Sequence, residues 1–82
     1  MTIREIRQYM AEKDKILRSD KDFNEGIYIK IIDGSEYRIY DVEVEEMGDY
    51  VLVWPEHHPF FLNHKDEIIV WYYLNVANRD IE

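Results

Sequence analysis

Apolar residues in the first part of the chain recur every three to four positions, the spacing that gathers them on one face of a helix. These residues are Ile3, Ile6, Tyr9, Met10, Ile16 and Leu17. Thr2 and Glu5 have the spacing of a capping box, in which a threonine hydroxyl and a glutamate side chain each accept a hydrogen bond from a backbone N–H at the start of a helix. The pattern predicts a helix over 2–18, ended by the polar segment 19–22.

From Gly26 onward the apolar period changes from 3.6 to 2, which is typical of strands. The first apolar positions of this kind are Ile27, Ile29 and Ile31. Asp33-Gly34 follows them, and an Asp-Gly pair after an alternating run is a strong hairpin signal, because a two-residue turn of type I′ needs positive φ at both positions. We therefore predict a strand followed by a tight turn at Asp33-Gly34.

A second strand is predicted over 36–46, but its apolar phase changes along its length. Tyr37 and Ile39 are odd-numbered, whereas Val42 and Val44 are even-numbered. A slip of one residue moves every later side chain of a strand to the opposite face. The pattern therefore predicts a β-bulge or a sharp bend near Tyr40-Asp41.

Three further short strands are predicted over 50–54, 60–62 and 67–74. The last of them, EIIVWYYL, is apolar on both faces, which indicates a strand that is central, that closes a barrel or that meets a partner. We predict one α+β domain over 1–82, with an N-terminal helix packed on a five-stranded, strongly bent antiparallel sheet or small barrel. The β region covers about 26–75, and a short C-terminal tail covers 76–82.

This order of elements resembles the small β-barrels of the Sm-like and SH3-like families. The similarity runs through the segments IYIKIIDGSEYRIYDVEV, DYVLV and FFLNHKDEIIVWY. Sm-like proteins typically form rings in which the fourth strand of one protomer pairs with the fifth strand of the next. The resemblance implies a homo-oligomer interface on the fifth strand at Ile69, Trp71 and Tyr73, although a buried strand of a monomer has the same composition. The RNA-binding signature of the Sm-like family is not found.

The composition narrows the class of protein. Of the 82 residues, 46% are hydrophobic and only five are Gly or Pro, which is typical of a folded domain. The chain has no Cys, so disulfides and thiolate metal sites are excluded. No apolar run approaches the ~20 residues of a membrane-spanning helix, and the first residues lack the apolar region of a signal peptide. We therefore expect a cytoplasmic protein without a membrane partner.

The formal net charge of -8 is concentrated in one part of the chain. Residues 1–22 carry six bases and five acids, whereas residues 23–82 carry four bases and thirteen acids. Within the second part, residues 33–56 hold eight acids and one base. This surplus would repel phosphate, so direct binding of nucleic acid is not expected. We also expect no RNA binding by the basic positions of the helix, which are Arg4, Arg7, Lys15 and Arg18.

Five carboxylates on the second strand and its following turn form what we call the acidic ridge: Asp41, Glu43, Glu45, Glu46 and Asp49. If Val42 and Val44 face the core, alternate acids of this strand lie on the opposite face, roughly 6–7 Å apart. One interpretation is a solvated face that keeps a small aromatic-rich domain soluble. Another is a mimic of a nucleic-acid backbone that fills a basic groove. A divalent-cation site is disfavoured, because the Asp-x-Asp-x-Asp-Gly spacing is missing.

The residues that could carry metal or catalytic chemistry are few. His57, His58 and His64 lack the helical spacing that would direct two imidazoles to one metal ion, so we interpret the segment Pro55–Pro59 as a structural loop. Neither of the two serines, Ser19 and Ser35, has an evident base partner. A chain of this length also offers little room to desolvate a catalytic carboxylate pair. We predict neither an enzyme nor a bound metal or cofactor.

The predicted strands contain more aromatic residues than a small core can enclose. They are Tyr28, Tyr37, Tyr40, Tyr50, Trp54, Phe60, Phe61, Trp71, Tyr72 and Tyr73. Exposed Trp and Tyr side chains dominate protein-binding hot spots, and we expect Tyr40 and Trp54, beside the acidic ridge, to anchor a protein partner.

Our first hypothesis is a non-catalytic acidic domain that occupies the basic nucleic-acid groove of a host defence or nucleic-acid-handling protein. In size, acidity and lack of Cys the chain is similar in type to the small inhibitors encoded by phages and mobile elements, such as anti-CRISPR and anti-restriction proteins. The alternative hypothesis is an Sm-like self-assembling module whose fifth strand is the oligomer interface.

Overall fold

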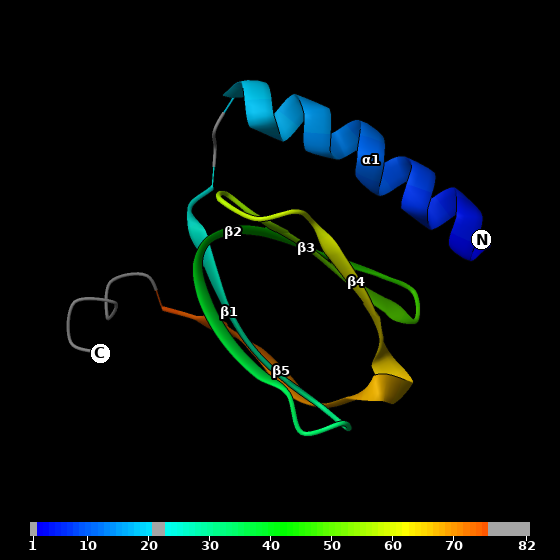
Figure 1. Cartoon of the computed structure of the whole chain (residues 1–82), viewed down its shortest axis with the longest axis vertical. Helices are drawn as coiled ribbons and strands as arrows, with labels where there is room; N and C mark the ends of the chain where they lie inside the picture. Colours follow the sequence, from blue (N-terminus) through cyan, green and yellow to red (C-terminus); the bar gives the residue numbers. More distant parts are fainter. Residues whose placement is uncertain (1, 21–22, 76–82) are drawn as a thin grey trace.

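A computed structural model describes residues 2–20 and 23–75 and contains one N-terminal helix and one five-stranded antiparallel sheet (Figure 1). The architecture is α+β, as predicted. The predicted tail over 76–82 lies outside the described residues. In chain order the elements are α1 (Ile3–Asp20), β1 (Glu25–Ile31), β2 (Glu36–Met47), β3 (Tyr50–Pro55), β4 (Phe61–His64), the 3₁₀ turn η1 (Lys65–Glu67) and β5 (Ile68–Leu74).

Helix α1 begins at the capping box that the sequence predicts. The backbone N–H of Glu5 donates to the Thr2 hydroxyl at 3.2 Å, and the backbone N–H of Thr2 donates to the Glu5 carboxylate at 3.2 Å. These bonds satisfy donors that a helix start otherwise leaves unpaired, and the bond from the Thr2 backbone lowers the pKa of Glu5. The predicted helix over 2–18 is confirmed, and its last residue is Asp20.

The strand order in the sheet is β4-β3-β2-β1-β5. Every neighbouring pair is antiparallel, and the two strands at the ends of this order do not pair with each other. The sheet therefore curves without closing into a barrel (Figure 1). Strand β5 is an edge strand that pairs with β1 alone among the described residues, so the interpretation of β5 as a central strand is wrong.

The turn between β1 and β2 is longer than the Asp-Gly pair suggests. The Ile31 carbonyl accepts from the Gly34 N–H at 3.0 Å, and the Ile31 N–H donates to the Ser35 carbonyl at 2.9 Å. Only Gly34 has positive φ, at 96°, so the predicted two-residue turn with two positive φ angles is wrong. The loop is a three-residue hairpin turn whose last position is glycine in a left-handed conformation.

The predicted bulge in β2 is confirmed at Asp41. Glu25 pairs with Val42 and Gly26 pairs with Tyr40, so Asp41 is the extra residue of this strand. It has φ of 61°, which Asp tolerates better than most residues because its short side chain bonds locally. The bulge returns the later apolar residues of β2 to the inside of the curve and bends the strand.

Two apolar clusters lie on the two faces of the sheet. Residues inside the curve form the inner cluster: Ile27, Val42, Val44, Val51 and Val53. The helix-side cluster joins α1 to the outer face of β3 and consists of Ile6, Met10, Leu17, Phe23, Leu52 and Trp54. Figure 1 shows α1 lying across the outside of the curve that β2, β3 and β4 form. The strand buried on both faces is therefore β3 and not β5.

Candidate functional site

The central acids of the acidic ridge face α1. Glu43 pairs with Trp54 in the β2–β3 register, so its side chain lies on the face that the helix covers. The Lys13 Nζ lies 3.0 Å from the Glu45 Oε2 and 3.6 Å from the Glu43 Oε1. The Tyr9 hydroxyl donates to the Glu45 Oε2 at 2.6 Å. Alternation along the strand is as predicted, but the two carboxylates form an intramolecular cluster with the helix.

This cluster shifts the pKa of both helix residues. The hydrogen bond to Glu45 and burial raise the pKa of the Tyr9 hydroxyl. Burial alone would lower the pKa of Lys13, but the hydrogen bond and the charge of Glu45 outweigh it, and the pKa is raised. Both groups therefore hold their protons more tightly in the folded chain than in the unfolded chain. The charges of the ridge contribute to the attachment of α1.

The remaining members of the acidic ridge do not extend it into one open row. Glu46 forms an ion pair with Lys65, which precedes β5 in η1. Asp41 occupies the bulge, where its carbonyl accepts from the Glu56 N–H at 2.9 Å. Asp49 is exposed in the β2–β3 turn. The five carboxylates are thus divided between the helix, η1, a bulge and a turn.

The two predicted aromatic anchors are not a pair of exposed rings. Trp54 is fully buried, and its indole N–H donates to the Met10 carbonyl at 3.1 Å. It is not accessible to a partner, which corrects the expectation from the sequence. Tyr40 is half-buried above Gly26, where a Cβ would lie only 3.0 Å from the Tyr40 ring and from the Leu74 Cβ. The absence of a side chain at Gly26 therefore leaves the space that the Tyr40 ring occupies.

The edge strand β5 exposes its apolar side chains. Ile69 and Tyr73, which the sequence assigned to an oligomer interface, are 59% and 52% exposed, whereas Trp71 is half-buried against the inner cluster. Val70 and Tyr72, which the sequence did not single out, are 40% and 46% exposed and lie opposite Lys30 and Tyr28 on the outer face of the sheet. The apolar character of β5 on both faces was the only sequence signal for these two residues.

A row of ordered side chains crosses the outer face of the sheet and ends at this edge. Arg38 pairs with Tyr28 in the β1–β2 register, and Tyr28 pairs with Tyr72 in the β1–β5 register. The Arg38 guanidinium lies 5.7 Å from the Tyr28 ring centroid, and the two tyrosine rings stack at 4.9 Å. Cross-strand stacking of this kind stiffens a sheet face. It holds Tyr72 in a defined orientation at the edge.

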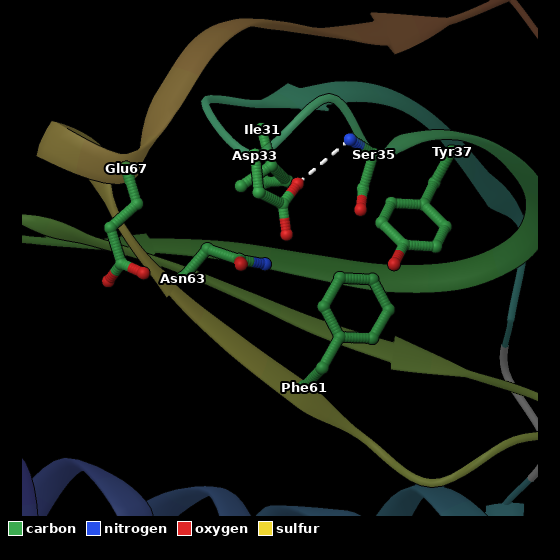
Figure 2. Close-up of a pocket in the computed structure, with 7 residues that line it drawn as sticks. All are labelled: Ile31, Asp33, Ser35, Tyr37, Phe61, Asn63 and Glu67. Carbon is green, nitrogen blue, oxygen red and sulfur yellow. Dashed lines mark hydrogen bonds between the residues drawn. The ribbon is translucent and has the colours of Figure 1, made fainter.

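A cavity of about 350 Å³ opens where the β1–β2 turn approaches β4. The side chains that border it are Asp33, Ser35, Tyr37, Phe61, Asn63 and Glu67. Figure 2 shows polar groups of Asp33, Ser35 and Asn63 directed toward the same space, with the rings of Tyr37 and Phe61 at one end and Glu67 at the other. The ring centroids are 6.2 Å apart. The residues of this site are distant along the chain, so no pattern in the sequence predicted it.

His58 and His64 form hydrogen bonds that fix the loops in which they lie. The Arg18 Nη2 donates to the His58 carbonyl at 2.6 Å and its Nη1 donates to the Glu56 carbonyl, so α1 holds the loop before β4. The His64 Nδ1 accepts from the Asp66 N–H at 3.0 Å and caps η1. Within residues 2–20 and 23–75, no three His, Asp or Glu side chains are arranged to hold a metal ion.

Comparisons with known proteins assign no family to the chain. No protein-family model, no curated protein and no solved structure matches it. Among the described residues there is also no helix with the length and apolarity needed to cross a membrane. The functional proposals below therefore rest on the chemistry and geometry of the chain itself.

Proposed function

We propose that this protein is a non-catalytic protein-binding module that assembles with further copies of itself through the outer edge of β5. The observation that supports the proposal is the place of the most apolar strand at an edge that no described strand pairs. Soluble proteins normally protect such an edge with charges or prolines, because its free N–H and C=O groups offer a template for another strand. Residues 68–74 contain neither.

Two pairings with a second copy are compatible with this edge. Antiparallel pairing of β5 with the β5 of another copy about a two-fold axis would use residues 70–74, the regular part of the strand after the irregularity at Ile69, and would give a closed dimer. Pairing of β5 with the β4 of another copy would use the four residues of β4 and give a ring, as in the Sm-like proteins that the chain resembles. In both cases a partner strand completes the open sheet, and the molar mass of the assembly distinguishes them.

The experiment compares two isoleucine variants by size-exclusion chromatography with light scattering. Ile69→Lys places a charge on the exposed edge strand, and we expect this variant to be a monomer at concentrations where the wild type is an oligomer. Ile32→Lys is the matched control, because Ile32 is 63% exposed but lies in the β1–β2 turn. A strictly monomeric wild type at high concentration would reject the proposal. Equal loss of assembly in both variants would show that the assembly is due to non-specific hydrophobic association and not to pairing of β5.

A second proposal is that the protein inhibits a nucleic-acid-handling protein by filling its basic groove. The surplus of eight acids over one base in residues 33–56 favours it. Reversing the charge of Glu43 and Glu45 would be a poor test, because Lys13 would then face two cations and the attachment of α1 would be weakened. The accessible members of the acidic ridge are Glu46 and Asp49.

The test of this second proposal is a pull-down from host lysate at low and at raised salt. We expect nucleic-acid-binding proteins to be captured at low salt and lost at raised salt, since the attraction is screened. Glu46→Gln combined with Asp49→Asn should reduce the capture, whereas Asp66→Asn, which neutralises another exposed acid, should not. Equal capture by all three proteins would exclude a role for the acidic ridge.

A further inference from the structure

The cavity between the β1–β2 turn and β4 has two carboxylates and no basic side chain among the described residues that line it. The Ser35 N–H donates to the Asp33 Oδ1 at 2.8 Å, and this bond lowers the pKa of Asp33, so the carboxylate is ionised at neutral pH. Glu67 supplies the second carboxylate from η1. Its backbone is tied to the turn, because its carbonyl accepts from the Ile32 N–H at 2.9 Å. The two carboxylates therefore border one space, Asp33 near its middle and Glu67 at the end away from the aromatic rings (Figure 2).

The other end of the cavity is aromatic. Tyr37 projects from the first residues of β2, and Phe61 from β4 is anchored against the inner cluster. Their rings lie with centroids 6.2 Å apart and are tilted by 37°. A ring face attracts a cation within ~6 Å of its centroid, and it also packs against an alkyl chain. Carboxylates and ring faces together favour a cation and disfavour an anion.

We propose that this cavity binds the end of a cationic alkyl chain, an alkylammonium or alkylguanidinium group of the kind that lysine and arginine side chains carry. The positive group lies between Asp33 and Glu67, beside Asn63, whose amide oxygen accepts one of its remaining N–H groups. The alkyl chain leaves past the rings of Tyr37 and Phe61. A volume of about 350 Å³ holds such a fragment and lies at the small end of the range for ligand sites, ~300–1,000 Å³.

A neighbouring cavity has two of the same lining residues but lacks the carboxylates. It shares Tyr37 and Phe61 with the first cavity, but its other walls include Arg38 and His58 in place of the two carboxylates. None of the described residues that line this second cavity carries a carboxylate. A cationic ligand is therefore directed to the Asp33 side of the ring pair and not to the Arg38 side. This site involves neither the pairing edge of β5 nor the acidic ridge, so it does not rest on the proposed function.

The test is a titration followed by two-dimensional NMR of the ¹⁵N-labelled full chain, at constant ionic strength. The probes are butylammonium, ethylguanidinium and a blocked tripeptide with arginine between two glycines, and butyramide is the neutral control. We expect saturable shifts of the Ser35 backbone N–H and the Asn63 side-chain amide at roughly millimolar probe, the range of fragment-sized ligands. Tighter binding of the tripeptide than of ethylguanidinium would identify a polypeptide side chain as the source of the cation, and equal binding would identify a free small molecule.

Matched variants separate this site from general attraction to an acidic protein. Asp33→Asn keeps the acceptor for the Ser35 N–H, and Glu67→Gln keeps the shape of the side chain, so both retain the fold. We expect each to weaken binding about fivefold, the scale of an accessible ion pair. Asp66→Asn should leave binding unchanged, because Asp66 is 92% exposed beside Glu67 and does not line the cavity.

Binding should persist in the Ile69→Lys variant, which separates this site from self-assembly. Shifts that do not saturate, or equal weakening by Asp66→Asn and Asp33→Asn, would overturn the proposal.

Discussion

Strands β2 and β5 carry opposite kinds of residues and occupy opposite kinds of position in the sheet. Strand β2 is internal in the strand order, because β1 pairs with its first part and β3 with its second part. Its second half is the most acidic segment of the chain, yet Glu43 and Glu45 of this half are bound by Lys13 of the helix. Strand β5 has no charged residue at all, yet it lies at the edge with four exposed apolar side chains. A charged strand can thus be an internal one, and an apolar strand can be the accessible one.

The difference follows from what covers each strand. Helix α1 lies over the outer face of β3 and brings Lys13 and Tyr9 to the carboxylates of β2. No described element covers the outer face or the outer edge of β5. Solvent exposure depends on the neighbours of a strand, so hydropathy alone does not assign a surface. For this protein the pairing edge and the cavity are stronger candidate sites than the acidic ridge.

Trp54→Ala should have the largest effect on folding, because Trp54 is fully buried between α1 and β3. Removing the indole opens a cavity between α1 and β3 and removes the hydrogen bond from the indole N–H to the Met10 carbonyl. We expect a loss of about 3–5 kcal/mol in the free energy of unfolding, measured by urea denaturation. A loss below about 1 kcal/mol would mean that α1 does not depend on this packing.

Gly26→Ala should have the next largest effect, because it tests the contact between the β5 end and the bulged part of β2. An added Cβ would lie 3.0 Å from the Leu74 Cβ and 3.0 Å from the Tyr40 ring. We expect a loss of about 1–3 kcal/mol from overpacking, measured in the same way. The double variant with Tyr40→Leu should cost less than the two single losses together, whereas simple additivity would exclude the clash with the ring.

Lys13→Met should cost about 1 kcal/mol at neutral pH, the scale of a partly exposed ion pair. The pKa of Lys13 is raised above its usual 10.5, so its contribution is complete at lower pH and is lost as the pH rises through the raised value. The stability difference between wild type and variant should therefore narrow above about pH 10.5, measured by urea denaturation at several pH values. Lys15→Met on the exposed side of α1 is the control, and a similar loss there would contradict a specific role for Lys13.

Tyr72→Ala should have the smallest effect on folding, because Tyr72 is 46% exposed on the edge strand β5. The ring loses only its stacking with Tyr28, a cross-strand contact of about 0.2–1 kcal/mol. The chain should remain folded by circular dichroism and should self-assemble more weakly by light scattering. A loss of stability as large as that of Trp54→Ala would show that β5 belongs to the core.

The elements could be predicted from the sequence because they depend on contacts close along the chain. The capping box located the start of α1, and the phase change of the apolar residues located the bulge at Asp41. The Asp33-Gly34 turn was located correctly, but its type was not, since a two-residue and a three-residue turn have the same Asp-Gly signal. Local patterns therefore predicted where each element lies better than how it is connected.

The candidate sites were less predictable, because each one joins distant segments. The alternation of β2 correctly placed Glu43 and Glu45 opposite Val42 and Val44, but it contained no sign that α1 would cover them. Tryptophan is common both in binding hot spots and in buried cores, and only the packing around Trp54 shows that it belongs to the core. The cavity brings Asp33 from a turn close to Glu67 from η1, and neither residue stands out in the sequence.

By itself the sequence determined the helix, five strands, the bulge, the surplus of acids and the absence of thiol chemistry, since these follow from period, spacing and composition. Only the tertiary structure decided which strand lies at the edge, which carboxylates are neutralised and which residues surround a cavity. These properties depend on the order of strands in the sheet and on the face that the helix covers. Both are set by the packing of segments far apart in the chain, to which local residue patterns do not respond.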